Sequence, residues 1–203
     1  MQSSSVATNR PRVAVLIPKE TRERIFTDVV VDALAAFAEP VIVADDQLAG
    51  ESLSELLKDI PVAITGWKSP KLPIQSLAPK GSVVFVSHAA GSIKALDILG
   101  SLEAGHIRVS HAAPKIADAV AEFTLTQILA HLRRHTEMDA GLRAGKPWFD
   151  LRHNHLGQLL GAQDVGIVGL GYVGHLVLKL LRPFGCNVCV YDPFIDSAQA
   201  EQL

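Results

Sequence analysis

The 203-residue sequence contains little cysteine, little net charge and no uninterrupted apolar run long enough to suggest a membrane span. The two cysteines, Cys186 and Cys189, lie three apart in a predicted strand, so their side chains should point to opposite faces. No second cysteine pair could complete a zinc site. The pair His131 and His135 lacks an evident third ligand. We therefore predict no metal and assign the cysteines to packing.

A formal net charge of -2 gives no basic surface for nucleic acid or for an anionic membrane. The most apolar segment, residues 165–181, contains four glycines, His175 and Lys179, which argue against a membrane helix. Residues 1–12 are polar and lack the apolar core of a secretory signal. The expected location is the cytoplasm.

The most informative feature is a glycine loop between a short apolar strand (Val165–Val168) and a helix. Glycines occur at 169, 171 and 174. In a dinucleotide-binding loop the first glycine permits a tight turn, the second lets the backbone approach a pyrophosphate, and the third lets the helix pack on the strand. The strand composition is typical of burial on both faces. The alternative is a glycine-rich packing turn with no ligand.

The residues that follow the loop support the nucleotide interpretation. Apolar residues repeat with helical spacing from Val173 to Leu181, and Gly185 can end that helix. A second strand (Asn187–Tyr191) then brings Asp192 to its end, close to the offset at which a carboxylate meets the adenosine ribose. Free N–H groups at the start of the helix would attract the pyrophosphate. Asp192 would repel a 2′-phosphate, which favours NAD over NADP.

The first half of the sequence alternates apolar strands with helices, which predicts a parallel sheet covered on both faces. Five strands of this length suit a flavodoxin-like order. The predicted strands are residues 12–17, 41–44, 62–65, 83–86 and 106–109, and the predicted helices are residues 25–38, 53–58, about one turn near 74–77, and 92–99.

Ligand-binding residues of such sheets lie at the carboxyl ends of the strands. After the fourth strand the sequence runs from Ser87 to Gly91 and then to a predicted helix. Small residues here would present backbone N–H groups to an anion. The other interpretation, equally supported by the spacing, is that Gly91 and Ser92 only begin a helix.

Pro114 precedes a long predicted helix, residues 116–138, whose apolar positions cover more than one face. Such a helix must lie between layers or pack against another chain. Residues 141–161 are predicted to form an irregular arm with Trp148 and Phe149 as anchors.

Taken in order, these segments resemble the NAD-dependent D-isomer-specific 2-hydroxyacid dehydrogenases, which include phosphoglycerate dehydrogenases and glyoxylate/hydroxypyruvate reductases. The matching motifs are His88-Ala-Ala-Gly91, Ala119-Val-Ala-Glu-Phe-Thr124, Arg143-Ala-Gly-Lys-Pro-Trp148, Val165-Gly-Ile-Val-Gly-Leu-Gly171 and Tyr191-Asp-Pro193.

The resemblance implies a domain organisation and a set of site residues. Residues 1–113 would be the substrate domain, and residues 114–203 the long helix, a dimerisation arm and the first βαβ unit of an incomplete NAD-binding Rossmann domain. Helix and arm (114–160) would form a homodimer. The implied substrate contacts are Ala90 and Gly91, and the implied cofactor contacts are Gly169, Gly171, Tyr172, Val173, Gly174 and Asp192.

The resemblance also implies that this sequence lacks the catalytic residues of the family. The catalytic arginine, glutamate and histidine of the family lie beyond the second strand of the cofactor sheet, so none maps onto a residue here. Position 111 carries histidine where the family often has asparagine. Two hypotheses remain. Either the chain is part of an enzyme that interconverts small 2-oxo and D-2-hydroxy acids and is inactive alone, or it is a non-catalytic dimerising or binding fragment, including a truncated gene product without a selected role.

Overall fold

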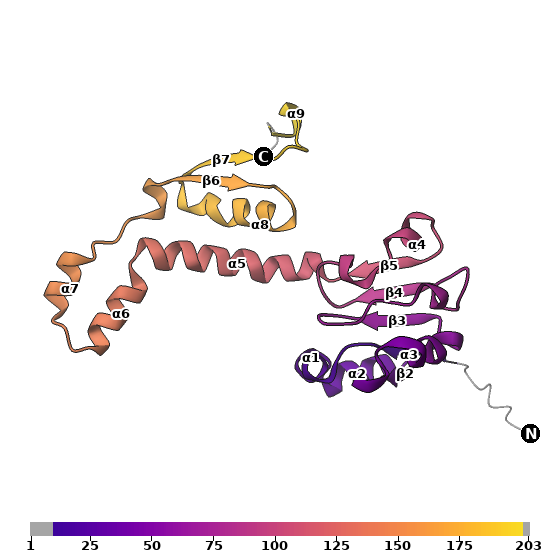
Figure 1. Cartoon of the computed structure of the whole chain (residues 1–203). Helices are drawn as coiled ribbons and strands as arrows, with labels where there is room; N and C mark the ends of the chain where they lie inside the picture. The colour runs from indigo at the N-terminus through magenta and orange to yellow at the C-terminus, as the bar shows by residue number, and fades with distance from the viewer. Residues whose placement is uncertain (1–9, 201–203) are drawn as a thin grey trace, which may run out of the picture. The chain divides into compact units, whose positions relative to one another are not determined.

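The computed structural model describes residues 10–200. Most of residues 1–12, for which no secretory signal is expected, therefore lies outside the described residues. The chain divides into two compact units, Met1–Ala113 and Pro114–Leu203. Each is described by itself, with the labels of Figure 1. The roles expected for the two units stay predictions.

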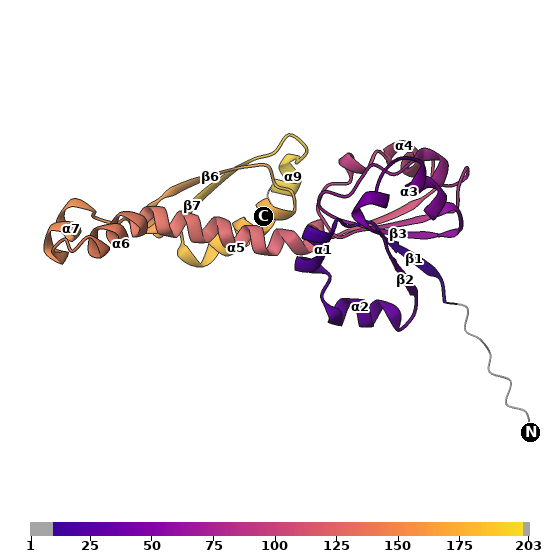
Figure 2. The same ribbon diagram turned by 60° about the horizontal axis from the view of Figure 1, so that its bottom comes forward.

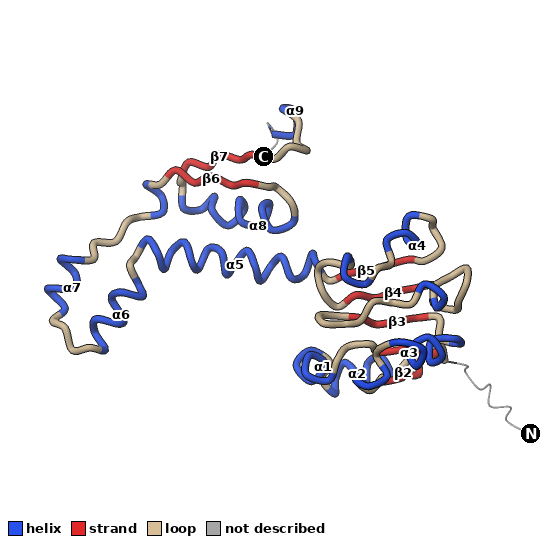
Figure 3. Tube along the Cα trace, in the orientation of Figure 1, coloured by secondary structure: helices blue, strands red, loops and turns tan. Residues whose placement is uncertain are grey.

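The first unit is built on a five-stranded parallel sheet in the order β2-β1-β3-β4-β5. This is the flavodoxin-like order, so the predicted fold class is confirmed. Figure 3 shows the strands in red and the helices that connect them along the chain in blue. The strands are β1 (Arg12–Val15), β2 (Glu39–Ile42), β3 (Val62–Thr65), β4 (Phe85–His88) and β5 (Arg108–His111).

Helices cover both faces of this sheet, and the interior strand β1 is accordingly apolar at successive positions. Val13 and Val15 pack in one core with Leu34, whereas Ala14 and Leu16 pack in a second core on the other face. Alternate residues of a strand point to opposite faces, so a fully apolar strand requires two covering layers. Figure 2 shows the unit from a second direction. The helices are α1 (Lys19–Ile25), α2 (Asp28–Ala35), η1 (Asp45–Gln47), α3 (Gly50–Leu56), η2 (Leu57–Asp59), η3 (Ile74–Ser76), η4 (Lys94–Leu96) and α4 (Leu99–Glu103).

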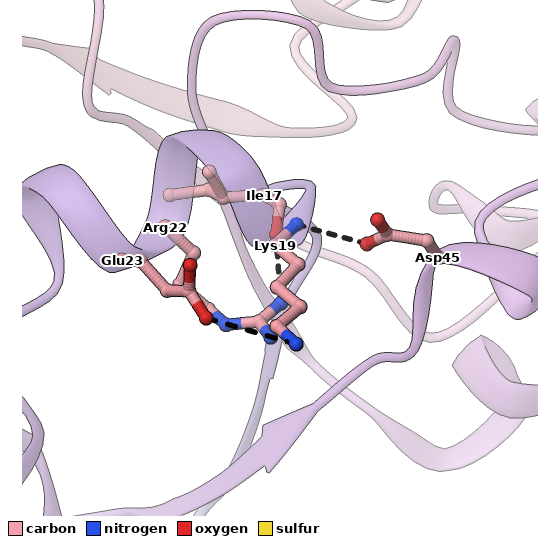
Figure 4. A network of polar contacts seen from close by, with 5 residues as sticks. All are labelled: Ile17, Lys19, Arg22, Glu23 and Asp45. Carbon is pink, nitrogen blue, oxygen red and sulfur yellow. Dashed lines mark hydrogen bonds and ion pairs between the residues drawn. The ribbon is translucent and has the colours of Figure 1, made fainter.

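Polar contacts fasten α1 to the ends of the first two strands (Figure 4). The backbone N–H of Lys19 donates to Asp45 Oδ1 at 2.9 Å, so a carboxylate from η1 satisfies an N–H group at the start of α1. Arg22 Nη1 donates to the carbonyl of Ile17 at 3.0 Å. The pair Lys19–Glu23, 3.8 Å apart, is exposed and adds little.

Some predicted elements of this unit were wrong in position. The helix predicted over 25–38 is shorter, since α2 spans only Asp28–Ala35 and begins after Thr27, which has extended backbone. Ile25 instead ends α1, a helix that was not predicted. Of the predicted apolar face only Leu34 is buried, while Val29 and Phe37 are exposed. Strands β4 and β5 begin two residues later than predicted. Their ladders continue through Ser87, His88, Ser110 and His111, since backbone pairing does not require apolar side chains.

The second unit holds β6 (Asp164–Val168) and β7 (Asn187–Tyr191), a parallel pair. One face of this pair packs with α8 and α5 in a shared core that includes Ala121, Leu160, Val177 and Leu181. Cys186 lies just before β7 and packs at the edge of that core, whereas Cys189 in β7 is exposed, so the assignment to packing holds for Cys186 and is wrong for Cys189. The helices are α5 (Ala113–Leu132), α6 (His135–Arg143), α7 (Trp148–Asn154), η5 (Leu160–Ala162), α8 (Tyr172–Leu181), η6 (Arg182–Phe184) and α9 (Ser197–Ala200).

The prediction that Val165–Val168 is buried on both faces was wrong. Val165 and Ile167 pack in the core, but Val168 is 86% exposed and Gly166 is exposed. The apolar run is typical of a strand covered twice, whereas the described residues supply helices on one face only.

The long helix is shorter than predicted and the arm is more helical. Arg134 has left-handed backbone (φ 52°) and separates α5 from α6. The carbonyl of Leu132 accepts the N–H of Gln158, which returns from the arm. Within the arm Leu151 is buried and packs closely on Gly141, whereas Trp148 and Phe149 are exposed. The two aromatic residues therefore do not anchor the arm within the described chain.

Among the described residues, no helix is long and apolar enough to cross a membrane.

Candidate cofactor site

The candidate site is the loop between β6 and α8 together with the end of β7. Gly169 takes φ +91°, a backbone conformation that side chains disfavour, and thereby turns the chain sharply after β6. Its N–H donates to the carbonyl of Tyr191 at 2.8 Å, which extends the pairing of β6 with β7 by one residue. The loop therefore begins at a fixed point on the sheet.

The other two glycines have different surroundings. A Cβ added to Gly174 would lie 2.2 Å from the carbonyl oxygen of Gly169, so only glycine lets α8 approach the loop this closely. A Cβ added to Gly171 would meet no atom within 4 Å. The space beside Gly171 is thus open, which is where a pyrophosphate would approach the backbone.

Asp192 connects the end of β7 to this loop. Its Oδ2 accepts the N–H of Leu170 at 2.6 Å, and its Oδ1 accepts the N–H of Phe194 at 2.8 Å. These two hydrogen bonds, that from Leu170 first, lower the pKa of the Asp192 carboxyl below its ordinary value, and the charge of His175 adds to the effect. Asp192 is therefore an ionised acceptor at neutral pH.

The first turn of α8 supplies the remaining donors. The N–H groups of Tyr172, Val173 and Gly174 precede the first intrahelical hydrogen bond, which the N–H of His175 makes to the carbonyl of Gly171 at 3.1 Å. The side chain of Val173 packs in the core, so Val173 offers only its backbone to a ligand, whereas Tyr172 is exposed. The geometry provides amides and a helix dipole for an anion.

Two cavities flank the loop, and both include Leu170, Gly171 and His175. One, of about 600 Å³, is mainly apolar and also involves Asp118 and Tyr172; the other, of about 580 Å³, also involves Asp192 and Phe194. A ligand that crosses Gly171 can occupy both. His175 was not among the predicted site residues, although its place directly after Gly174 in the first helical turn was a usable signal.

The predicted substrate contacts lie in the first unit, in a bend after β4. Ala90 is buried and its carbonyl accepts the N–H of Ala112, while Gly91 is exposed. The helix predicted to begin at Ser92 is wrong: η4 spans only Lys94–Leu96 and ends at Asp97, which has left-handed backbone. A helix dipole therefore does not support anion binding at Gly91, and only the bend itself remains.

A buried polar pair under that bend was missed from the sequence. Thr65 and His88 are paired in the register of β3 and β4, and Thr65 Oγ1 lies 2.9 Å from His88 Nδ1. Burial, and to a lesser extent the charge of His111, lower the pKa of His88. His88 is thus favoured as a neutral ring in the sheet. His111 Nδ1 accepts the N–H of Ala113, the first residue of α5, at 3.2 Å, and an asparagine side-chain oxygen could accept there as well.

Comparison with known proteins identifies the second unit. Residues 125–203 match the family model described as the D-isomer specific 2-hydroxyacid dehydrogenase, NAD binding domain. Residues 125–203 thus match the NAD-binding domain of the D-isomer-specific 2-hydroxyacid dehydrogenase family. The family expected from the motifs is confirmed, and so is NAD as the cofactor that its domain description names.

Two curated relatives of the family illustrate the match. The chain is 38% identical over 88 residues to a D-2-hydroxyacid dehydrogenase (NAD+) of Lacticaseibacillus paracasei, covering 43% of this chain and 26% of that protein. It is 31% identical over 156 residues to a D-3-phosphoglycerate dehydrogenase of Mycobacterium leprae (strain TN), covering 76% of this chain and 29% of that protein. The matches thus span less than a third of these relatives.

Solved structures show the same fold. A phosphoglycerate oxidoreductase from Rhizobium etli superposes with a TM-score of 0.69 at 22% identity, covering 95% of this chain and 58% of that chain. An NAD-dependent formate dehydrogenase from Staphylococcus aureus, solved in complex with NAD, has a TM-score of 0.64 at 24% identity and covers 90% and 56%.

Gly171 and Gly174 of the loop give a matched pair of variants. We expect Gly174→Ala to lower the free energy of unfolding of the second unit by about 2–3 kcal/mol, because its Cβ meets a backbone oxygen that cannot move aside. Gly171→Ala should cost under about 1 kcal/mol, the price of a weaker N-cap. Urea unfolding followed by the fluorescence of Trp148 in a Trp67→Phe background measures both. Equal stability of the two variants would contradict the packing described.

Proposed function

We propose that the second unit binds NAD(H) across the glycine loop, with the diphosphate on the first turn of α8 and the adenosine ribose at Asp192. The observation that carries this proposal is the fixed geometry of the loop. Gly169 turns it, Asp192 holds it through Leu170, and the N–H groups of Tyr172, Val173 and Gly174 are left to donate. An ionised Asp192 accepts ribose hydroxyls and repels a 2′-phosphate, which supports NAD rather than NADP.

We further propose that the whole protein to which this sequence belongs interconverts a small 2-oxo acid and a D-2-hydroxy acid by hydride transfer. The nicotinamide of the bound cofactor supplies or takes up the hydride. The residues of this chain would bind and orient the two molecules: the bend at Ala90 and Gly91 offers main-chain groups to the substrate carboxylate, and the loop at 169–174 holds the dinucleotide. The D-2-hydroxyacid and phosphoglycerate dehydrogenases named above support this reaction class.

The 203-residue chain alone is proposed to be inactive. In the family resemblance the catalytic arginine, glutamate and histidine follow the second strand of the cofactor sheet, and residues 192–203 contain no arginine and no histidine. His88 is 4% exposed and is favoured as a neutral ring, which does not suit a proton donor to substrate. General acid catalysis contributes roughly 10²–10⁴-fold, so turnover without it should be negligible.

The second candidate is a non-catalytic dimerising or binding fragment, and one observation favours it. Phe123, 63% exposed, lies with Val120 on the side of α5 that is left uncovered within the unit. A helix with apolar residues on two faces is stabilised by a further layer. We propose that α5 and the arm, residues 114–160, form a homodimer interface.

A cytoplasmic location without nucleic-acid or membrane partners remains part of the proposal.

Cofactor binding and turnover separate the two candidates. We expect NADH to bind weakly, since only part of a nucleotide sheet is described, and we expect no reduction of glyoxylate or hydroxypyruvate above the buffer rate. Asp192→Ala should abolish the preference for NADH over NADPH, measured by fluorescence titration. Asp164→Ala is the control, because that carboxylate lies at the opposite end of the same strand pair.

Turnover at the rate of an ordinary dehydrogenase would sink the claim of inactivity. Absence of any NADH binding, with the second unit folded, would sink the cofactor assignment and leave the fragment hypothesis.

The interface is tested separately by sedimentation velocity. We expect the wild type to be a dimer and Phe123→Asp to shift it to monomer, because a charge in an apolar interface is not compensated. Phe37→Asp is the control, since Phe37 is 66% exposed but lies beside α2 in the first unit. A monomeric wild type, or a Phe123→Asp variant that remains a dimer, would refute the interface.

A further inference from the structure

His175 occupies the point where the two cavities beside the glycine loop meet. It is exposed and contributes to both cavities, together with Leu170 and Gly171. Side chains of a helix tilt toward its N-terminus. The ring of a residue in the first turn of α8 therefore lies over the loop, close to the amides that precede the first intrahelical hydrogen bond.

The ring is held by one specific contact. His175 Nδ1 lies 3.1 Å from the carbonyl oxygen of Gly171. A carbonyl oxygen can only accept, so Nδ1 must carry the proton, whether the ring is neutral or charged. Nε2 is then the ring atom available to a ligand: it accepts when the ring is neutral and donates when the ring is protonated.

We propose that His175 is a cofactor-binding residue that contacts the diphosphate of the dinucleotide through Nε2. This inference rests on the proposed binding of NAD(H) at the loop. The open space beside Gly171, where an added Cβ meets nothing within 4 Å, is where the diphosphate approaches the backbone. The carbonyl of that same glycine holds Nδ1, so the position of the ring is set by the residue that the diphosphate must cross.

A carboxylate lies on each of the two cavities that His175 lines. Asp118 of α5 lies on the apolar cavity and Asp192 at the end of β7 lies on the other. The other titratable side chains nearby, Tyr172 and Lys179, belong to α8 itself. The charge of a protonated ring would offset the repulsion between these carboxylates and a diphosphate.

Substitutions of His175 distinguish the role of Nδ1 from the role of Nε2. His175→Asn retains a donor near the position of Nδ1 and lacks Nε2, whereas His175→Gln places a donor near Nε2. Lys179→Ala is the control, because it removes an exposed positive charge one turn further along the same helix. Calorimetric titration with ADP-ribose, which contains the diphosphate, and with adenosine, which lacks it, measures the affinities of the full-length chain.

We expect His175→Ala and His175→Asn to weaken ADP-ribose binding roughly fivefold, the value of one exposed charge-assisted hydrogen bond. His175→Gln should recover part of that loss. Adenosine binding and the Lys179→Ala variant should be unchanged, and urea midpoints should agree among the variants.

Four results would overturn the inference. Wild-type affinity of His175→Asn together with weak binding by His175→Ala would show that the ring only supports Gly171. An equal loss for adenosine would place the contact away from the diphosphate. Wild-type affinity of all His175 variants in a chain that binds ADP-ribose would refute the contact alone, whereas a folded wild type that binds no ADP-ribose would refute the proposed function with it.

Discussion

The hydrogen bond from the N–H of Leu170 to Asp192 is the contact on which the geometry of the cofactor site depends. A loop with three glycines has a large conformational entropy, and that entropy opposes any single arrangement. The carboxylate at the end of the neighbouring strand removes much of that freedom, because it fixes the residue between the first two glycines. Since the same carboxylate also accepts the N–H of Phe194, one side chain sets both the glycine loop and the path of the chain after β7.

This arrangement gives Asp192 two functions that reinforce one another. Its main-chain donors keep it ionised, and an ionised acceptor is what discriminates a ribose hydroxyl from a 2′-phosphate. Each carboxylate oxygen has more than one lone-pair direction, so the structural hydrogen bonds leave capacity for a ligand. Specificity for NAD would thus arise from the group that shapes the loop. One face of the pair β6 and β7 is exposed, as Val168 shows. A two-stranded sheet covered on one side is only marginally stable, so we expect this unit to hold a ligand less rigidly than a larger sheet would.

Much of the architecture could be predicted because each element carried a local signal. The strand, helix and strand around the cofactor site were predicted from the glycine spacing, the apolar positions of α8 and the strand that ends at Asp192. Strands β3 and β7 agree with their predicted bounds. Errors arose where backbone pairing or tertiary contacts override side-chain pattern. His88 and His111 extend β4 and β5 although they are polar, and Arg134 ends α5 within a helical pattern. The side-chain partners of Asp192 and His175 could not be predicted, since a periodic pattern does not specify which lone pair meets which N–H group.

The central claim is that Asp192 holds the glycine loop before any cofactor binds. Amide hydrogen exchange of the cofactor-free chain, resolved by residue with nuclear magnetic resonance, tests it most directly. The Leu170 amide should exchange much more slowly than those of Tyr172 and Val173, and Asp192→Ala, which removes the acceptor, should remove that protection while the amides of β6 stay protected. A Leu170 amide that exchanges as fast as its neighbours in the wild type would contradict the account.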